Sequence, residues 1–356
     1  MSTPKRPTAR SRPVIGIWFI AGWFPVFCLL AVTPARAQGK TDVVTLGNGD
    51  RITGEVKRLE RGRLEFSTDD AGTLYLEWDK LISVVAQRFF EVGTSSGDRF
   101  LGSLAAAQPR MISVATGLSV VPLDMSEVTS ILPIGRSFWR RLDGSIDAGF
   151  TYTQSSGIAQ LTLNSDTVFR KPASSIRLTV SATQTRQREG DDDDRATIEM
   201  SYLRYPWQRW FMFVAGRFER NQSLGLDLRS QLAGAVGPRL INSNRAQMAA
   251  GAGVVVNNEQ GVDVGAEQTV EGLLMWRTSY FTYDTPKTNL DVSVLYYPSL
   301  SDRGRHRLQL DAAIKHEFWK DFFASLSLYD TFDSRPPNPE AEKNDVGIVF
   351  SLGWSY

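Results

Sequence analysis

The eleven residues "VGIVFSLGWSY" near the C-terminus alternate between large apolar side chains and smaller ones. Alternation with a period of two is typical of a β-strand that has one face in an apolar medium. About nine to eleven residues is also the length that a tilted strand needs to cross a lipid bilayer. The large positions are Val346, Ile348, Phe350, Leu352, Trp354 and Tyr356. The segment alone does not distinguish a soluble core from a membrane.

The same alternation recurs from about residue 141 onward, in twelve segments separated by polar loops. We expect strands at Leu142–Thr153, Ile158–Arg170, Ile176–Gln187, Ala196–Arg204, Trp210–Glu219, Leu228–Pro238, Arg245–Val256, Gln268–Tyr283, Leu290–Pro298, His306–Phe318, Phe322–Thr331 and Asp345–Tyr356. Antiparallel neighbours in sequence order form an up-and-down sheet, and an even strand count is usual for bacterial barrels. The pattern therefore predicts an all-β fold with a transmembrane β-barrel of about twelve strands over residues 141–356.

The connections between these strands alternate in length. The short ones read "KPASS", "PWQ", "NSN", "DTPKTN" and "WKD", whereas the other set contains "QREGDDDD", "NQSLGLD", "NNEQGVDVGAE" and "SRPPNPEAEKN". Short periplasmic turns and longer extracellular loops are typical of outer-membrane barrels. We therefore expect an outer-membrane protein whose N-terminal part lies in the periplasm.

Aromatic residues gather at the short turns, as expected for rings at the headgroup level of a membrane. The clusters are Tyr202, Tyr205, Trp207 and Trp210, then Trp276, Tyr280 and Tyr283, and then Phe318, Trp319, Phe322 and Phe323. Core packing is the alternative use of such rings.

An internal repeat precedes the barrel. Residues 43–84 resemble residues 90–131, and the turn residues Gly49, Asp50 and Arg51 recur as Gly97, Asp98 and Arg99. Each copy predicts a small five-stranded barrel of the SH3 or Sm type, with a hairpin turn at Asn48-Gly49 or Ser96-Gly97. We place the modules at 38–86 and 87–132, with a linker at 133–140. The Gly-Asp-Arg turns are interpreted as surface turns with local pairing, and a ligand site is the alternative.

Residues 1–37 have the pattern of a signal peptide. A basic start is followed by an apolar stretch and by "ARAQ", with Ala35 and Ala37 before a cleavage site at Gln38. A retained transmembrane anchor is the alternative. The one cysteine of the chain, Cys28, lies in this segment, so the processed protein would have no thiol for a disulfide or a metal site.

Charge and chemistry exclude several classes of function. The chain has 40 Lys and Arg against 39 Asp and Glu, a balance that gives no electrostatic case for nucleic acid as a partner. Its two histidines, His306 and His316, share the outward parity of their strand, and neither has a serine two residues on. We therefore predict no enzyme and no cofactor. The acidic run Asp191–Asp194 is interpreted as a solvated loop, with divalent-cation binding as the alternative.

The inward parity of the strands predicts a lumen with charges of both signs. These residues are Arg177, Glu199, Arg217, Glu219, Glu271, Arg277, Asp291, Arg307, Asp311, Lys315 and Glu317. A barrel of about twelve strands is wider than the eight-stranded kind that side chains fill, and narrower than an open porin. Mixed charges favour a plugged lumen or a weak, unselective pore.

Three segments carry a resemblance to a known family: "WRRLDGSIDAGFTYTQSSG", "RFERNQSLGLDLRSQLAGAVG" and "YDTFDSRPPNPEAEKNDVGIVFSLGWSY". Residues 139–356 resemble the domain-of-unknown-function family 481, which includes YdiY-like salt-induced outer-membrane proteins. The "NGDRITGEV" modules resemble small N-terminal domains that some members carry. The resemblance implies an outer-membrane β-barrel and brings no reaction, substrate or cofactor.

The sequence thus predicts a non-enzymatic envelope protein of the Gram-negative outer membrane, structural or weakly permeable. The alternative is an adaptor whose periplasmic modules bind a protein or peptidoglycan, and a lipid hydrolase is third. Expected partners are outer-membrane lipids, lipopolysaccharide and, during biogenesis, the barrel-assembly machinery. The alternating residues Ile348, Phe350, Leu352, Trp354 and Tyr356 resemble the signal that this machinery recognises.

Deletion of Tyr356 is therefore expected to slow assembly several-fold. Pulse-chase labelling followed by gels that separate the folded, heat-modifiable barrel from the unfolded chain measures the rate. The matched control is Ser355→Ala, on the small face of the same strand. Insertion of the Tyr356-deleted protein at the wild-type rate would show that this residue is no assembly signal.

Overall fold

The computed structural model describes residues 40–117, 119–135, 138, 141–155, 157–187, 193–221, 226–261, 267–335 and 343–354. Residues 40–356 form one compact unit. The predicted signal-peptide residues Ala35, Ala37 and Gln38 lie outside the described residues, and so does Tyr356.

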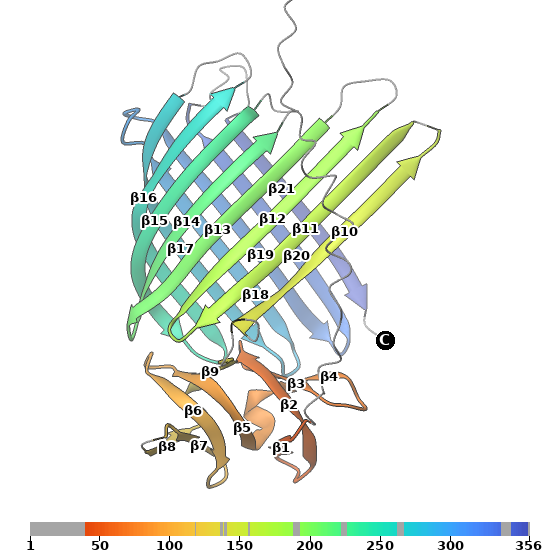
Figure 1. Ribbon diagram of the computed structural model, residues 1–356, viewed down its shortest axis with the longest axis vertical. Helices are drawn as coiled ribbons and strands as arrows, with labels where there is room; N and C mark the ends of the chain where they lie inside the picture. Colours follow the sequence, from red (N-terminus) through yellow and green to blue (C-terminus); the bar gives the residue numbers. More distant parts are fainter. Residues whose placement is uncertain are drawn as a thin grey trace, which may run out of the picture. The chain divides into compact units, whose positions relative to one another are not determined.

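Twelve consecutive strands form one antiparallel sheet in strict sequence order, which confirms the up-and-down barrel architecture (Figure 1). The strands are β10 (Leu142–Thr153), β11 (Ile158–Lys171), β12 (Ser174–Arg186), β13 (Asp193–Trp207), β14 (Trp210–Asn221), β15 (Leu226–Asn242), β16 (Ala246–Gly261), β17 (Glu267–Thr282), β18 (Thr288–Pro298), β19 (His306–Trp319), β20 (Phe322–Asp333) and β21 (Asn344–Trp354). The connections alternate between two to five residues at one end and four to ten at the other. We call these the short-turn end and the long-loop end.

The predicted strand bounds err by up to five residues, most at β16. This strand runs to Gly261 rather than to Val256. Its last residues, from Asn257 on, are polar on both faces and carry no alternation, yet they continue the backbone ladder with β15 and β17. Hydrogen bonding between strands, which the side-chain pattern does not record, sets the end of β16.

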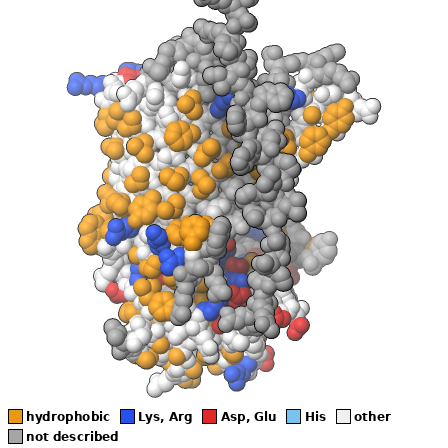
Figure 2. All heavy atoms as spheres, viewed as in Figure 1, with side chains coloured by type: hydrophobic (Ala, Val, Ile, Leu, Met, Phe, Trp, Pro, Cys, Tyr) orange, Lys and Arg blue, Asp and Glu red, His pale blue; other side chains and the backbone are white. Residues whose placement is uncertain are grey.

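The outer face of the barrel is apolar and exposed. Ile198, Met200, Leu232, Phe218 and Val254 are among its large side chains. Figure 2 shows apolar side chains spread over the visible wall. A contiguous apolar surface on this scale marks an interface with a membrane or a partner, because water does not solvate it well.

The two edge strands of this sheet, β10 and β21, are not paired with each other in the described part of the chain. β10 pairs with β11, and β21 pairs with β20. Both strands are exposed on both faces: every residue of β10 after Leu142 is exposed, and so is most of β21. We call the boundary between β10 and β21 the seam.

The small residues of β21 have a packing reason. Gly347 lies opposite Tyr329, and Gly353 lies opposite Phe323, on the inner face. A Cβ atom at either glycine would overlap the ring opposite to it. The rings of β20 thus cover the backbone of β21, so this face has to stay small while the outer face is large.

The N-terminal β module comprises nine strands and a short 3-10 helix. The strands are β1 (Asp42–Leu46), β2 (Arg51–Glu60), β3 (Arg63–Ser67), β4 (Thr73–Glu77), β5 (Leu81–Thr94), β6 (Arg99–Ala106), β7 (Met111–Ala115), β8 (Val120–Asp124) and β9 (Val128–Pro133), and the helix is η2 (Trp78–Lys80). Each repeat contributes five strands, because β5 belongs to both copies. The sheet order is β4-β3-β2-β1-β5-β6-β7-β8, with β9 pairing with β2 and β5.

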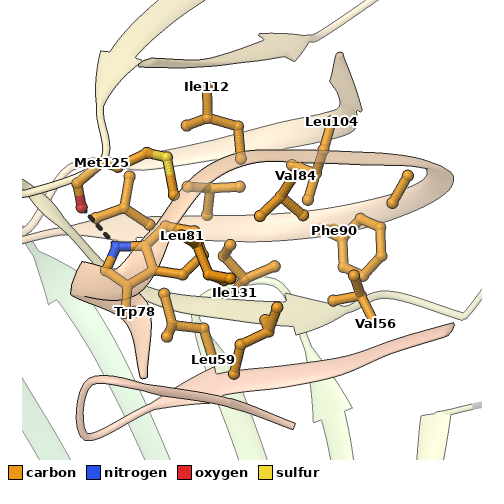
Figure 3. Packing of buried hydrophobic residues seen from close by; sticks show 14 of the residues in the cluster. Val56, Leu59, Trp78, Leu81, Val84, Phe90, Leu104, Ile112, Met125 and Ile131 are labelled. Carbon is orange, nitrogen blue, oxygen red and sulfur yellow. Dashed lines mark hydrogen bonds between the residues drawn. The ribbon is translucent and has the colours of Figure 1, made fainter. Parts of the chain in front are cut away.

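The two repeats share one sheet and one hydrophobic core. β5 pairs through its first half with β1 and through its second half with β6, so it belongs to both copies. Side chains of both copies pack in a single cluster (Figure 3). Trp78 of the first copy donates a hydrogen bond from Nε1 to the Met125 carbonyl of the second, at 2.6 Å. The copies therefore stabilise each other.

Pairing of β10 with β21 is expected in a bilayer, because an open sheet edge leaves backbone donors and acceptors unsatisfied in lipid. The processed chain has no cysteine, so Ser145→Cys or Thr151→Cys can be combined with Val349→Cys or Ser351→Cys on the inner face. At least one combination should cross-link under mild oxidation in membranes, as measured by gel mobility. Each single variant is the control. Absence of any cross-link would show that the seam stays open.

Candidate functional site

The N-terminal β module is bound to the short-turn end of the barrel. Four of the five short turns contribute contacts. The backbone N–H of Ala173 donates to Glu91 at 2.7 Å, and the amide of Asn244 donates to the Val128 carbonyl at 2.8 Å. Gln208 donates to Asp98, and Tyr283 donates to the Arg61 carbonyl at 2.8 Å. The contact is therefore polar and distributed around the rim.

Arg61 makes the densest set of these contacts. Its guanidinium donates to Asp291 at 3.1 and 3.3 Å and to Asn289 at 2.8 Å, and it lies 4.7 Å from the Phe281 ring centre. Arg61 and Gly62 form a two-residue hairpin turn with positive φ at both positions, 52° and 70°. Asn, Asp or Gly normally occupy the first position. The Arg61 side chain thus contacts the barrel, although a positive φ is unfavourable for the backbone of a residue such as arginine.

A close contact with the barrel backbone requires glycine at position 62. A Cβ atom there would overlap the carbonyl oxygen of Asn244 in the β15–β16 turn. The β2–β3 turn and a barrel turn therefore meet backbone to backbone.

An exposed ion pair adds to the contact. Lys80 of η2 lies 2.7 Å from Asp284 of the β17–β18 turn. The hydrogen bond from Lys80 lowers the pKa of the Asp284 carboxyl, and the same bond raises the pKa of Lys80. Both directions favour the charged pair at neutral pH, although exposure to solvent limits its strength.

The two Gly-Asp-Arg turns have different environments. In the first copy, Gly49, Asp50 and Arg51 are exposed; the Asp50 carboxylate accepts a hydrogen bond from the Asn48 amide, and the Asp50 backbone N–H donates to the Asn48 side-chain oxygen. This copy is a surface turn, as interpreted from the sequence.

The second copy contacts the barrel. Gly97 is buried, and a Cβ atom there would overlap the Gln208 carbonyl. Asp98 accepts from the Gln208 amide, and Arg99 pairs with the buried Glu91 and lies 4.2 Å from the Tyr205 ring centre. The expectation of local pairing between Asp98 and Arg99 is wrong: Asp98 accepts from Ser96 and Gln208, and Arg99 pairs with Glu91.

A cavity of about 1120 Å³ lies inside the barrel, above the bound module. Strands β11–β19 form its wall, and module residues such as Glu91, Arg99 and Leu132 also line it. The module therefore forms part of the cavity wall at the short-turn end.

The predicted lumenal residues fall into three groups. Those that line the cavity are Arg177, Glu199, Arg217, Glu219, Arg277 and Arg307. Glu271 is buried and pairs with Arg307, and Asp291 is held by Arg61 and by Ser279 at 2.6 Å. Asp311 lies opposite Tyr329, and Lys315 lies 3.6 Å from the Phe323 ring centre.

Glu317 has a different place from the one expected. Its carboxylate accepts hydrogen bonds from the backbone N–H groups of Lys287 and Asp321, at 3.0 and 2.9 Å. It ties two short turns together and is not among the cavity-lining residues.

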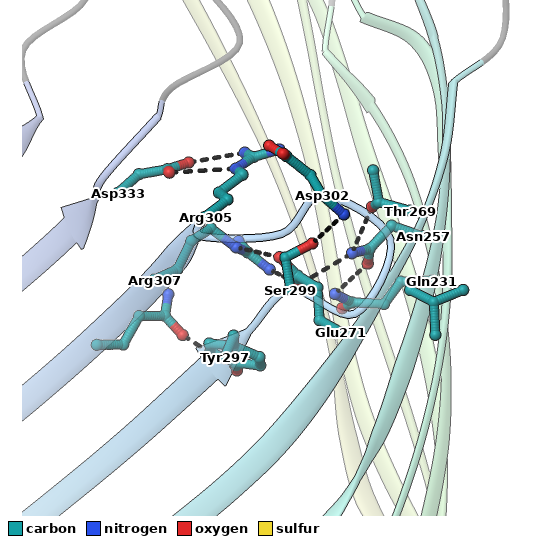
Figure 4. A network of polar contacts seen from close by, with 12 residues as sticks. Gln231, Asn257, Thr269, Glu271, Tyr297, Ser299, Asp302, Arg305, Arg307 and Asp333 are labelled. Carbon is teal, nitrogen blue, oxygen red and sulfur yellow. Dashed lines mark hydrogen bonds and ion pairs between the residues drawn. The ribbon is translucent and has the colours of Figure 1, made fainter.

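A polar network runs from strand to strand along the inner face of the barrel, near the long-loop end of the cavity (Figure 4). Gln231 donates to Asn257 at 2.8 Å, and Asn257 donates to Glu271 at 3.1 Å. Arg307 donates to both oxygens of Glu271, with Nε at 2.9 Å from Oε1. Four strands thus share one charge-assisted chain, which satisfies a carboxylate that is only 2% exposed.

Between this network and the module, one side of the cavity is apolar. Val255 and Leu273 are buried there, and Met275 and Leu295 pack against them. Sequence reasoning missed this wall because it looked for charges at inward positions. The run Leu273-Leu274-Met275-Trp276 is apolar at both parities, which indicates a strand with apolar surroundings on both faces.

The aromatic clusters divide between two roles. Trp207, Trp210 and Trp319 are exposed on the outer side of the short-turn end, as expected for a membrane girdle. Tyr205 and Phe323 instead contact cationic side chains on the inner face. Arg239 lies 4.5 Å from the Tyr205 ring centre, and Lys315 lies over the Phe323 ring. The sequence predicted either a membrane girdle or core packing for these rings, and it did not indicate the cation–π contacts.

The histidines have structural partners. His306 packs near Tyr296 and Phe332, and His316 shares a 2.8 Å hydrogen bond with Thr288. Of the acidic run, Asp191 and Asp192 lie outside the described residues, and Asp194 pairs with Arg186 at 2.6 Å. Among the residues with described positions, no group of three or more His, Cys, Asp or Glu is arranged to hold a metal ion.

A family model described as "Protein of unknown function, DUF481" matches residues 146–356. The chain belongs to this family. The DUF481 region spans all of β11–β21 and most of β10. The twelve-stranded antiparallel sheet with its apolar outer face has the architecture of a membrane-spanning β-barrel.

Other comparisons add little to the DUF481 assignment. A solved structure described as a bacterial polysaccharide outer membrane secretin is similar over 75% of this chain and 96% of its own, with 9% identity and a TM-score of 0.36. No curated protein matches the chain. In the described part of the chain, no helix is long and apolar enough to span a membrane.

The two Gly-Asp-Arg copies provide a matched test of docking. Arg99→Ala removes the partner of a buried carboxylate and a ring contact, so it should destabilise the docked module by about 2–3 kcal/mol. Arg51→Ala, at the exposed equivalent position, should change it by less than about 0.5 kcal/mol. Hydrogen exchange of the Ala173 amide, which donates to Glu91 across the contact, measures both in folded protein. Equal effects of the two variants would contradict the docking role of the second copy.

Proposed function

We propose that this protein is a non-enzymatic outer-membrane β-barrel whose lumen is closed on the periplasmic side by its own N-terminal β module. The observation that carries the proposal is the position of the module. It binds four short turns, and it lines the end of the cavity that those turns surround. A barrel closed in this way is at most weakly permeable.

Two independent features support this orientation. Short turns face the periplasm in outer-membrane barrels, and the module lies at the short-turn end. A segment that follows a signal peptide would also remain in the periplasm while the barrel inserts. The exposed apolar wall would then face outer-membrane lipid and lipopolysaccharide, after assembly by the barrel-insertion machinery.

The contacts of the module suit a removable closure more than a permanent one. They consist of hydrogen bonds, ion pairs and arginine–ring stacking, and water can replace these polar contacts when the module leaves. The module also has its own hydrophobic core, so it need not unfold when it leaves the rim.

An adaptor function remains the second candidate, because part of the module surface stays free. The turn Asn48–Arg51 of the first copy is exposed, and so is Val120 at 62%. A periplasmic protein or peptidoglycan could bind there without displacing the module from the barrel.

Planar-bilayer recordings test the closure. Mature protein should be silent or show rare small steps, because the module blocks the lumen. The double variant Arg61→Ala/Arg99→Ala should raise the open probability several-fold, and deletion of residues 38–132 should give stable single-channel steps. The control Arg51→Ala/Lys57→Ala, with both changes on the module outside these contacts, should behave as wild type.

Two other results would contradict closure by the module. A barrel that stays silent without residues 38–132 is closed by its own side chains, and the module is then not the closure. Silent recordings together with recovery of a periplasmic protein bound to the mature chain would favour the adaptor.

A further inference from the structure

Arg239 and Arg277 face the cavity on either side of Ala249. The sheet register pairs Arg239 with Ala249, and Ala249 with Arg277. All three residues line the cavity. Since neighbouring strands lie about 4.8 Å apart, the two arginine Cα atoms are about 10 Å apart, with only a methyl side chain between them.

Neither guanidinium has a carboxylate partner in the described part of the chain. Arg239 donates to the Gln208 carbonyl at 2.8 Å and stacks on Tyr205, and its buried Nε has no partner. Arg277 makes no hydrogen bond or ion pair with any described residue, and its side chain is open to the cavity.

The nearby carboxylates are already engaged. Glu91 pairs with Arg99, and Asp291, on the strand next to Arg277, is taken by Arg61 of the module. Other cations of the cavity have carboxylate partners: Arg307 pairs with Glu271, Arg177 with Asp166 and Arg170 with Asp143, and Arg217 and Arg229 share Glu219. Docking of the module thus leaves a surplus of positive charge in the row Arg239–Ala249–Arg277, and an enclosed surplus of this kind attracts a counter-ion.

The apolar wall begins directly beside this row. Met275 lies on the same face of β17 as Arg277, two residues before it, and it is paired with Leu295 of β18. Both are half-buried and line the cavity. The cavity volume of about 1120 Å³ is close to the upper end of small-molecule sites, about 300–1,000 Å³.

We propose that Arg239 and Arg277 bind the oxyanion head of a small organic acid, a carboxylate or a phosphate, whose apolar body packs on Met275 and Leu295. Guanidinium groups hold either oxyanion through paired N–H donors. The site rests on the module-closed lumen of the proposed function, because the module supplies Arg99 and engages Asp291.

The test uses mature protein in nanodiscs of zwitterionic lipid, with 4-(trifluoromethyl)benzoate as the probe and fluorine NMR as the readout. Saturable binding above that of empty nanodiscs is expected. Arg239→Gln and Arg277→Gln should each raise the Kd about tenfold, because each removes a charge-assisted contact. Arg303→Gln, in the exposed β18–β19 loop, is the matched control and should leave the Kd unchanged.

Two further probes separate the possible chemistries. Tighter binding of 4-(trifluoromethyl)phenyl phosphate than of the benzoate identifies phosphate as the preferred head, and the reverse identifies carboxylate. The cation 4-(trifluoromethyl)benzylamine should not bind.

The inference is overturned if neither anion binds saturably, if the cation binds equally well, or if Arg239→Gln and Arg277→Gln leave both Kd values unchanged. Heat-modifiable mobility confirms that each variant is folded. Because conductance is not the readout, a barrel that proves open in recordings can still bind the probes, and a closed barrel can fail to.

Discussion

A strand that crosses an apolar layer has to satisfy its backbone N–H and C=O groups within its own sheet, because the surroundings offer no partners. This constraint explains the arrangement of residues 142–354. Each of the ten central strands pairs on both sides with its neighbours in sequence, and the connections are short at one end. Side chains then have only two environments, an outer apolar one and an inner one. Charged residues within the wall are directed inward, where they must pair with one another or with water.

The inner face meets this requirement by pairing across strands. Glu271 would be costly at 2% exposure if Arg307 and Asn257 did not donate to it. Tyr329 and Phe323 cover the glycines of β21 on the same face. The lumen is therefore built from specific contacts between strands, with a defined cavity rather than a wide channel. The module completes it at the rim, where backbone groups of the turns are free to bind.

Sequence patterns predicted the strands well and the contacts poorly. Alternation recurs twelve times, so the topology of β10–β21 follows from periodicity and loop length alone. Partners do not, because they depend on register: nothing in the sequence places Arg61 beside Asp291, 230 positions away. The repeat also misled in one respect, since identical Gly-Asp-Arg turns predicted identical environments. The apolar wall could have been found, because β17 is apolar at both parities around Leu273 and Met275.

The two copies of the repeat differ in the partners of their turn residues. This difference places positive charge in the cavity of a chain that is nearly neutral overall. A duplicated β unit keeps its fold through shared core positions, so its turn residues are free to change partners. In one copy the Asp-Arg pair stays in water. In the other it contacts the barrel, where Arg99 and Arg239 both lie over the Tyr205 ring. The module thus brings an arginine into the rim and, through Arg61, occupies a barrel carboxylate. Docking therefore changes the charge balance of the lumen as well as lining its short-turn end, and the two consequences arise from the same contacts.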